Sequence, residues 1–141
     1  MPENSISISF NLNSVENVRE TLTENLGQLF RDDPTPIPGG EILIMDMKQD
    51  YQYTADFLRE NGDDPEKEFV DSMGWDLRDH PIFLDITNHS RFEFKAYFES
   101  LGKVIAEVVT SKEKCRAILK INDEEWTWFE NGKEAKVQNT A

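Results

Sequence analysis

The 141-residue chain contains a single cysteine, Cys115, and only two histidines, His80 and His89. One cysteine cannot close a disulfide within the chain, which excludes a disulfide-stapled secreted scaffold and favours a reducing, cytoplasmic setting. The two histidines are nine positions apart, a spacing that matches no established metal-binding pattern. We therefore expect the protein to bind neither a metal ion nor a cofactor.

Long apolar runs are also missing. The longest aliphatic run, residues 42–45, is far shorter than the roughly 20 residues that a membrane-spanning helix needs. Residues 1–12 contain neither the basic nor the apolar block of a signal peptide, so we expect no such leader. The sequence predicts a soluble protein that does not bind membranes.

Catalytic motifs are absent as well: the chain has no G-x-S-x-G, no phosphate-binding G-x-x-x-x-G-K-[ST] and no C-x-x-C pattern. The basic neighbours Lys112, Lys114 and Arg116 would make the Cys115 thiol more reactive if it were exposed. We expect instead a small buried residue at the start of a strand. The sequence therefore predicts that the protein is not an enzyme.

Basic residues are scarce relative to acidic ones. Against 15 lysines and arginines stand 28 aspartates and glutamates, which gives a net charge of −13 and an isoelectric point near 4.5. Such a molecule repels the phosphates of nucleic acids, so we expect no direct nucleic-acid binding. All of the excess acid lies in residues 1–100, and residues 46–85 alone hold 12 acidic and 4 basic side chains.

What the chain does have is enough apolar material for one core. Its length is that of a single domain, and 38% of its residues are hydrophobic, including nine phenylalanines and three tryptophans. We expect one acidic α+β domain over residues 1–141, with a mixed or antiparallel sheet and a C-terminal β-meander. Predicted strands cover 5–12, 41–47, 82–87, 115–121, 125–130 and 133–137, and predicted helices cover 15–30, 50–61 and 64–74. Residues 32–40, with three prolines and two glycines, predict an extended connector.

The segment 90–111 fits two structures. As a helix, it has a capping box of Ser90 and Glu93 and an apolar face that runs from Phe94 to Val109. As a hairpin, it has alternating phenylalanines before Gly102 and β-branched residues after it. We favour a helix over 91–111.

Several residues with chemical potential have simpler structural explanations. The carboxylate pairs Asp63/Asp64 and Asp76/Asp79 lie at predicted helix starts, where aspartate caps the backbone. Both histidines are expected in loops or turns. Trp126 and Trp128 point to the same side of a predicted strand, where they either pack against a helix or form an exposed aromatic patch for a partner, and we expect them to fill the core.

The acidic centre of the chain is the candidate binding site. Complementary charge speeds the encounter of two proteins, and a rigid acidic fold can hold carboxylates where a nuclease expects phosphates. In size and charge the chain resembles the acidic immunity proteins with which bacterial cells neutralise their own nuclease toxins, and also the DNA-mimicking anti-restriction proteins, although no motif of a named family aligns. The predicted partner is a basic protein, such as a nuclease toxin. The predicted partner-binding residues are Asp56, Glu60, Asp63, Asp64, Glu66, Glu68, Asp71, Trp75, Asp76 and Asp79.

A second hypothesis is a small acidic chaperone for a secreted effector. It requires an exposed apolar groove, for which residues 92–98 are the candidates. The sequence leaves open whether the protein is a monomer or a homodimer.

Overall fold

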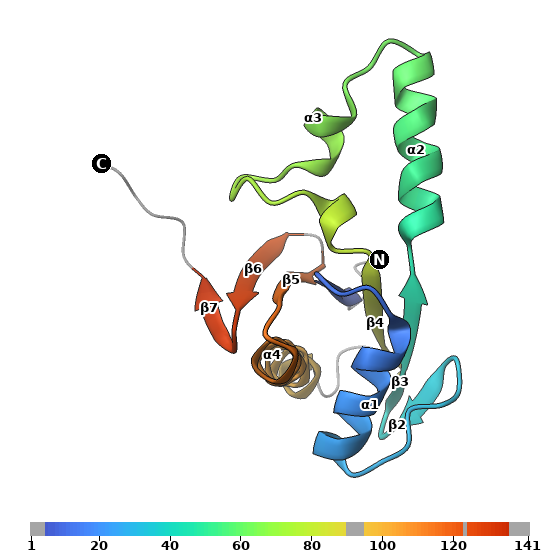
Figure 1. The fold of residues 1–141 in the computed structure, drawn as a ribbon. Coiled ribbons are helices and arrows are strands. Elements are labelled where there is room, and N and C mark those ends of the chain that lie inside the picture. The colour runs from blue at the N-terminus through green and yellow to red at the C-terminus, as the bar shows by residue number, and fades with distance from the viewer. Residues whose placement is uncertain (1–4, 90–94, 123, 136–141) are drawn as a thin grey trace.

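The structure, a computed structural model, describes residues 5–89, 95–122 and 124–135. Its centre is a seven-stranded antiparallel sheet in the order β2-β3-β4-β1-β5-β6-β7 (Figure 1). The strands are β1 (Ser5–Phe10), β2 (Thr35–Ile37), β3 (Gly40–Asp46), β4 (Ile82–Asn88), β5 (Arg116–Ile121), β6 (Glu125–Glu130) and β7 (Lys133–Ala135). The helices are α1 (Val15–Leu26), α2 (Lys48–Glu60), α3 (Pro65–Phe69), α4 (Lys95–Glu113) and the 3-10 helix η1 (Leu77–Asp79). The predicted α+β class is confirmed.

Strand β1 shows how the sheet acquires its two faces. Its isoleucines and Phe10 belong to the core on the face covered by α1 and α4, and its serines point to the opposite face. Figure 1 shows both helices on the same side of the sheet. The alternation Ser5 to Phe10 thus places the central strand with its apolar side in the core, as the sequence predicts. Helix α4 packs closely on β1 and β5, because Gly102 has no side chain. A Cβ atom at this position would lie only 3.0 Å from Ile6 Cγ2 on β1 and 3.3 Å from Leu119 Cδ1 on β5.

Helix α4 settles the ambiguity of 90–111 in favour of a helix. Phe98, Ile105 and Val109 are fully buried at helical spacing, so one continuous stripe faces the sheet. The alternative hairpin is wrong, since a hairpin would have turned every second residue toward the core. The proposed capping box of Ser90 and Glu93 lies outside the described residues.

Several predicted boundaries need correction. Strand β1 ends at Phe10 rather than at residue 12, and helix α4 ends at Glu113 rather than at residue 111. Helix α1 ends at Leu26 rather than near residue 30, because Gly27 adopts a left-handed conformation with φ of 70°, and Phe30 is buried from the loop. Helix α2 begins at Lys48 rather than at Asp50, and it is the Asp46 carboxylate that accepts a hydrogen bond from the Lys48 backbone N–H. Helix α3 stops at Phe69 instead of residue 74, because Val70 forms a β-bridge with Asp76.

The connector 32–40 contains a strand that the sequence did not predict. Residues Thr35–Ile37 pair with β3 as the edge strand β2, and Pro36 is exposed there. An edge strand tolerates proline because one side of its backbone needs no sheet partner.

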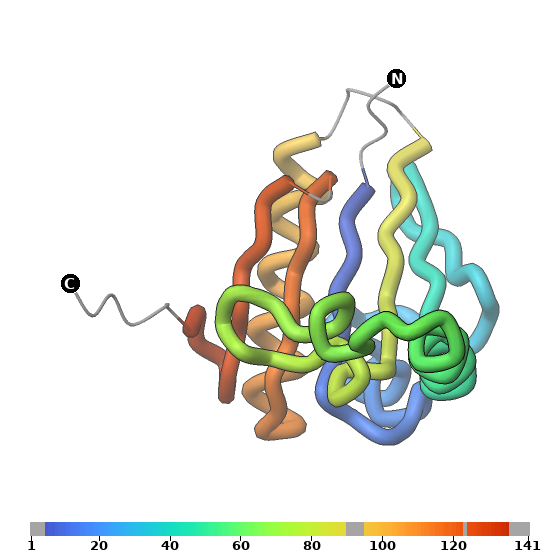
Figure 2. The backbone as a smooth tube through the Cα atoms, turned by 90° about the horizontal axis from the view of Figure 1, so that it is seen from above, coloured from blue at the N-terminus to red at the C-terminus, as the bar shows by residue number. Residues whose placement is uncertain are grey.

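Between β3 and β4 the chain leaves the sheet as an acidic arm, which we define as residues 47–81. Helix α2 rises away from the end of β3 on the face opposite α1 and α4, and α3 and η1 lead back to β4 (Figure 1). In Figure 2, the segment from α3 to η1 crosses in front of β5, while α4 lies behind the sheet. The arm closes at its base, where the Met47 N–H donates a 2.8 Å hydrogen bond to the Pro81 carbonyl.

Candidate protein-binding surface

The acidic arm has a small apolar centre of its own between α2 and α3. Tyr51 meets Phe69 edge to face, with ring centroids 5.6 Å apart, and Ala55 is 2% exposed. The Arg78 guanidinium covers the Phe69 ring at 5.1 Å. These contacts hold α2 and α3 side by side, so the carboxylates of the arm are carried on an ordered support.

An aromatic stack attaches the arm to the sheet. The rings of Trp75 and His80 are nearly parallel, with an interplanar angle of 8° and centroids 5.4 Å apart. On β5, the Arg116 guanidinium lies 4.8 Å from the centre of the Trp75 ring. Trp75 is therefore half-buried under a cation, and its ring anchors the arm to the sheet.

Asp71 organises the loop after α3. Its Oδ1 accepts hydrogen bonds from the backbone N–H groups of Met73 at 2.9 Å and Trp75 at 3.0 Å. Its Oδ2 accepts from the indole Nε1 of Trp128 on β6, also at 2.9 Å. Because both oxygens accept hydrogen bonds from the loop and from β6, the Asp71 carboxylate serves the structure of the arm.

Asp76 is likewise engaged inside the arm. Its carboxylate caps η1 through the Arg78 backbone N–H at 2.9 Å and receives the Arg78 guanidinium at 2.6 Å. The hydrogen bonds from Arg78 hold the pKa of Asp76 below its usual range. Together with Asp71 and Trp75, Asp76 belongs to the frame that positions the remaining acidic residues.

The other seven predicted contact residues are all exposed. Within the described residues, Glu60, Asp63 and Glu68 form no ion pair within 4 Å, and Asp56 is paired with Arg59 at 3.2 Å. Asp64 caps α3 by accepting from the Glu66 N–H at 3.0 Å, as the sequence predicts. The full set is Asp56, Glu60, Asp63, Asp64, Glu66, Glu68 and Asp79.

Some of these exposed carboxylates project from the molecule at the end of α2. Glu60 is the last residue of the helix, and Asp63 and Asp64 follow in the connection to α3, which lies far from the sheet (Figure 1). Few cations in the arm oppose them, because residues 47–81 hold ten acidic and four basic side chains. Negative potential therefore extends from the arm into solvent.

His80 is fully buried at the point where the arm joins β4. Its Nδ1–H donates to the Asp76 carbonyl at 2.8 Å, and within the described residues its Nε2 has no hydrogen-bond partner. Burial lowers the pKa of His80, so the ring is neutral at physiological pH. The position matches the predicted loop location, and the ring is a packing element.

The two tryptophans of β6 do not fill the core between sheet and helices. They lie on the face opposite α4, where Trp126 is 38% exposed and packs against the Lys120 ammonium at 4.1 Å, and Trp128 is half-buried near the arm. The prediction that these tryptophans fill the core is wrong for both, since Trp126 is exposed and Trp128 packs near the arm. Alternation shows which residues share a face, but it does not show which face a helix covers.

The same face of the sheet carries a row of polar residues. Ser7 of β1 lies between Asp85 of β4 and Lys120 of β5 in the strand register. Burial raises the pKa of Asp85, whose Oδ2 accepts a 3.1 Å hydrogen bond from the Thr87 hydroxyl. The half-burial of this carboxylate could not be predicted from the sequence, because it depends on the strand register that aligns Asp85 with Ser7 and Lys120.

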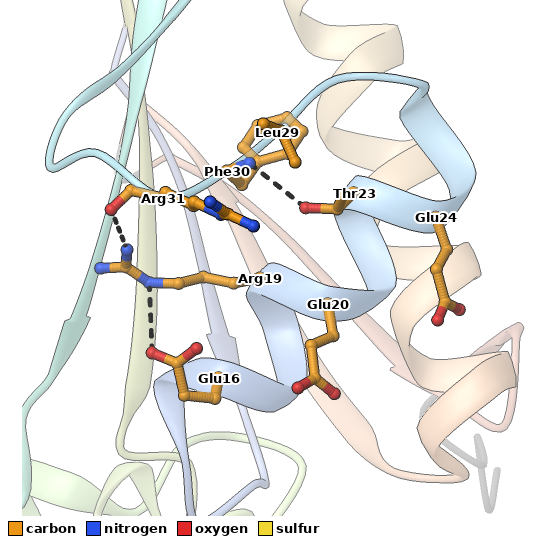
Figure 3. A pocket seen from close by; sticks show the side chains of 8 residues that line it. All are labelled: Glu16, Arg19, Glu20, Thr23, Glu24, Leu29, Phe30 and Arg31. Atoms are coloured by element: carbon orange, nitrogen blue, oxygen red, sulfur yellow. Dashed lines mark hydrogen bonds and ion pairs between the residues drawn. The ribbon is translucent and has the colours of Figure 1, made fainter.

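A pocket of about 310 Å³ lies on α1 and the loop that follows it, away from the arm (Figure 3). The Arg19 guanidinium spans it, donating to the Arg31 carbonyl at 2.6 Å and lying 3.9 Å from Glu16. The Thr23 hydroxyl oxygen accepts from the Phe30 N–H, and neither His80 nor Cys115 lines the pocket. The lining residues are Glu16, Arg19, Glu20, Thr23, Glu24, Leu29, Phe30 and Arg31.

Cys115 is buried, as predicted. Burial and the neighbouring Glu113 raise the pKa of its thiol to about 12, so it is not a reactive thiolate. In the part of the chain that the structure describes, no three acidic, histidine or cysteine side chains come together to hold a metal ion. No helix within those residues is long and apolar enough to cross a membrane.

Comparisons with protein families, with curated proteins and with solved structures find no match to this chain. The geometry and charge of the arm are therefore the features that point to a function.

Proposed function

We propose that the protein is an acidic inhibitor that binds a basic protein, such as a nuclease toxin, through the acidic arm. The observation that supports this proposal is the position of Glu60 and Asp63 at the projecting end of α2 and of Glu68 on α3, where all three are exposed and without an ion pair in the described part of the chain. Carboxylates held in this way can occupy the phosphate-binding positions of a nuclease. Inhibition then results from substrate mimicry.

The ordered base of the arm favours binding. Because Trp75 and Asp71 fasten the arm to β5 and β6, the carboxylates lose little freedom when a partner docks. Complementary charge raises the association rate more than it raises the intrinsic affinity. The proposed complex is therefore expected to form quickly and to weaken as salt rises.

The chaperone hypothesis has less support. It needs an exposed groove near residues 92–98, but Phe98 is fully buried in the core, and residues 92 and 94 lie outside the described residues. The hypothesis of a DNA-mimicking anti-restriction protein differs only in the target, since that target is also a basic protein with a phosphate-binding surface.

The test is a charge reversal on the arm. The immobilised protein captures partners from the lysate of its source cell at low salt, and the basic protein that elutes at high salt is purified for kinetics. We expect Glu60→Lys, Asp63→Lys and Glu68→Lys together to slow its association about tenfold or more. Asp64 is left intact because it caps α3.

A matched control places the same change on the other side of the molecule. Glu20 and Glu24 on α1 and Glu107 on α4 are exposed, and replacing all three by lysine changes the net charge equally. Equal slowing by both triple variants would show an effect of net charge alone and would contradict the proposed surface. Recovery of no basic partner would contradict the proposed function itself.

A further inference from the structure

Helix α2 exposes two aromatic side chains on its outer side. Tyr53 is 75% exposed and Phe57 is 56% exposed, and the interval of four residues places them next to each other on the helix. The side of α2 that packs toward α3 uses other residues, Tyr51 and Ala55 among them. The exposed pair is therefore not needed to hold the arm together.

Acidic side chains surround this pair. Asp50 lies three residues before Tyr53, and Asp56 lies three residues after it. Glu60 lies three residues after Phe57. All three carboxylates are therefore on the same side of α2 as the aromatic pair. All three are exposed. An aromatic centre within a charged rim has the composition of an interface hot spot, and adjacent anchors on one helix suit a groove on a partner.

The following inference rests on the proposed function. We propose that Tyr53 and Phe57 are the apolar anchor of the complex. Both side chains enter an apolar pocket on the basic partner, and lysine or arginine residues surround that pocket. The charge around the pair selects this occupant, because the carboxylates of α2 favour a cationic rim. A second copy of this chain is disfavoured, since both copies would bring a net charge of −13 and the same acidic arm.

Photo-crosslinking tests the proposal directly. The probe is p-benzoylphenylalanine in place of Phe57, and the control carries the same side chain in place of Tyr97, an aromatic residue on α4 that is 48% exposed on the opposite layer. Illumination in the source-cell lysate is expected to link position 57 to one basic protein, at an apolar residue near lysines or arginines. Position 97 is expected to give no such product.

The crosslinked protein then serves as the probe for kinetics. We expect Tyr53→Gln with Phe57→Gln to lower its affinity about 30-fold, mainly through faster dissociation, and to do so at low and high salt alike. Glutamine retains helix propensity, so the thermal midpoint should stay close to that of the wild type. Tyr97→Gln should leave the affinity unchanged.

The possible failures are distinguishable. If the charge reversal slows association while the glutamine variant binds normally, the anchor is wrong and the proposed function stands. If position 57 links to a second copy of this chain or to an acidic protein, or to no protein at all, the anchor is overturned. If no basic protein is bound by the wild type, the proposed function and the anchor fall together.

Discussion

The indole Nε1 of Trp128 donates a 2.9 Å hydrogen bond to Oδ2 of Asp71, across 57 positions of sequence. This contact joins β6, near one edge of the sheet, to the loop after α3 in the acidic arm. The other carboxylate oxygen of Asp71 organises that loop through two backbone N–H groups. One side chain thus shapes the loop and fastens it to the sheet.

Removing this carboxylate should loosen the arm. We expect Asp71→Ala to lower the free energy of unfolding by about 2 kcal/mol, since three donors lose a charged acceptor, and Trp128→Phe to lower it by about 1 kcal/mol. Urea denaturation measures both values. Amide hydrogen exchange should accelerate in the arm more than in β1. Wild-type stability and exchange in Asp71→Ala would contradict the role of Asp71.

The buried His80 predicts a pH dependence of stability. Its pKa is lowered in the folded protein, so below about pH 6.5 the unfolded chain binds the additional proton first. The contribution of the neutral ring is therefore complete above pH 6.5 and is lost as the pH falls toward the lowered pKa. Unfolding free energies measured between pH 7.5 and 5.5 should fall more steeply for the wild type than for His80→Asn. Parallel curves for the two proteins would refute this.

Asp85 predicts a pH dependence of stability with the opposite sign, in which the folded state becomes less stable as the pH rises. Burial raises its pKa in the folded state, so the ionised side chain destabilises the fold at neutral pH. We expect Asp85→Asn to raise the thermal midpoint at pH 7, because asparagine keeps an oxygen for the Thr87 hydroxyl. The gain should shrink as the pH is lowered and the wild-type carboxyl group becomes protonated. A variant less stable than the wild type at pH 7 would show that Asp85 makes a stabilising contact as an anion.

The core can be tested with two leucines of α1 and the loop after it. Leu22 is fully buried and Leu29 is 58% exposed, so the same substitution gives a matched pair. Leu22→Ala should cost about 2–5 kcal/mol by leaving a cavity, and Leu29→Ala should change stability by about 0.5 kcal/mol or less. Chemical denaturation decides between them. Similar losses in both variants would overturn the assignment of the core face of α1.

Local patterns were sufficient for much of the fold. The alternation in β1 and the helical stripe of α4 follow directly from the two periods of side-chain direction. The turn at Asn131 and Gly132 adopts the positive φ values, 52° and 86°, that its residues predict. In each case the structure follows from residues that are close together in the sequence.

The structure of the arm could not be predicted from such local patterns. The short span of α3 depends on the bridge between Val70 and Asp76, and the role of Asp71 depends on Trp128 from a distant strand. Composition identified the acidic segment, but it could not separate structural carboxylates such as Asp71 from exposed ones such as Asp63. That distinction arises only when strands far apart in sequence are paired.

The hydrogen bond from Met47 to Pro81 means that the arm leaves and rejoins the sheet at one place. Strands β3 and β4 are adjacent and antiparallel, so their register, with Asp46 opposite Ile82, would be complete with only a tight turn between them. Changes in the length or surface of the arm can therefore accumulate with little effect on the helices behind the sheet. The core between the sheet and helices α1 and α4 lies on the opposite face, so the surface of the arm can change while the residues that form that core stay the same.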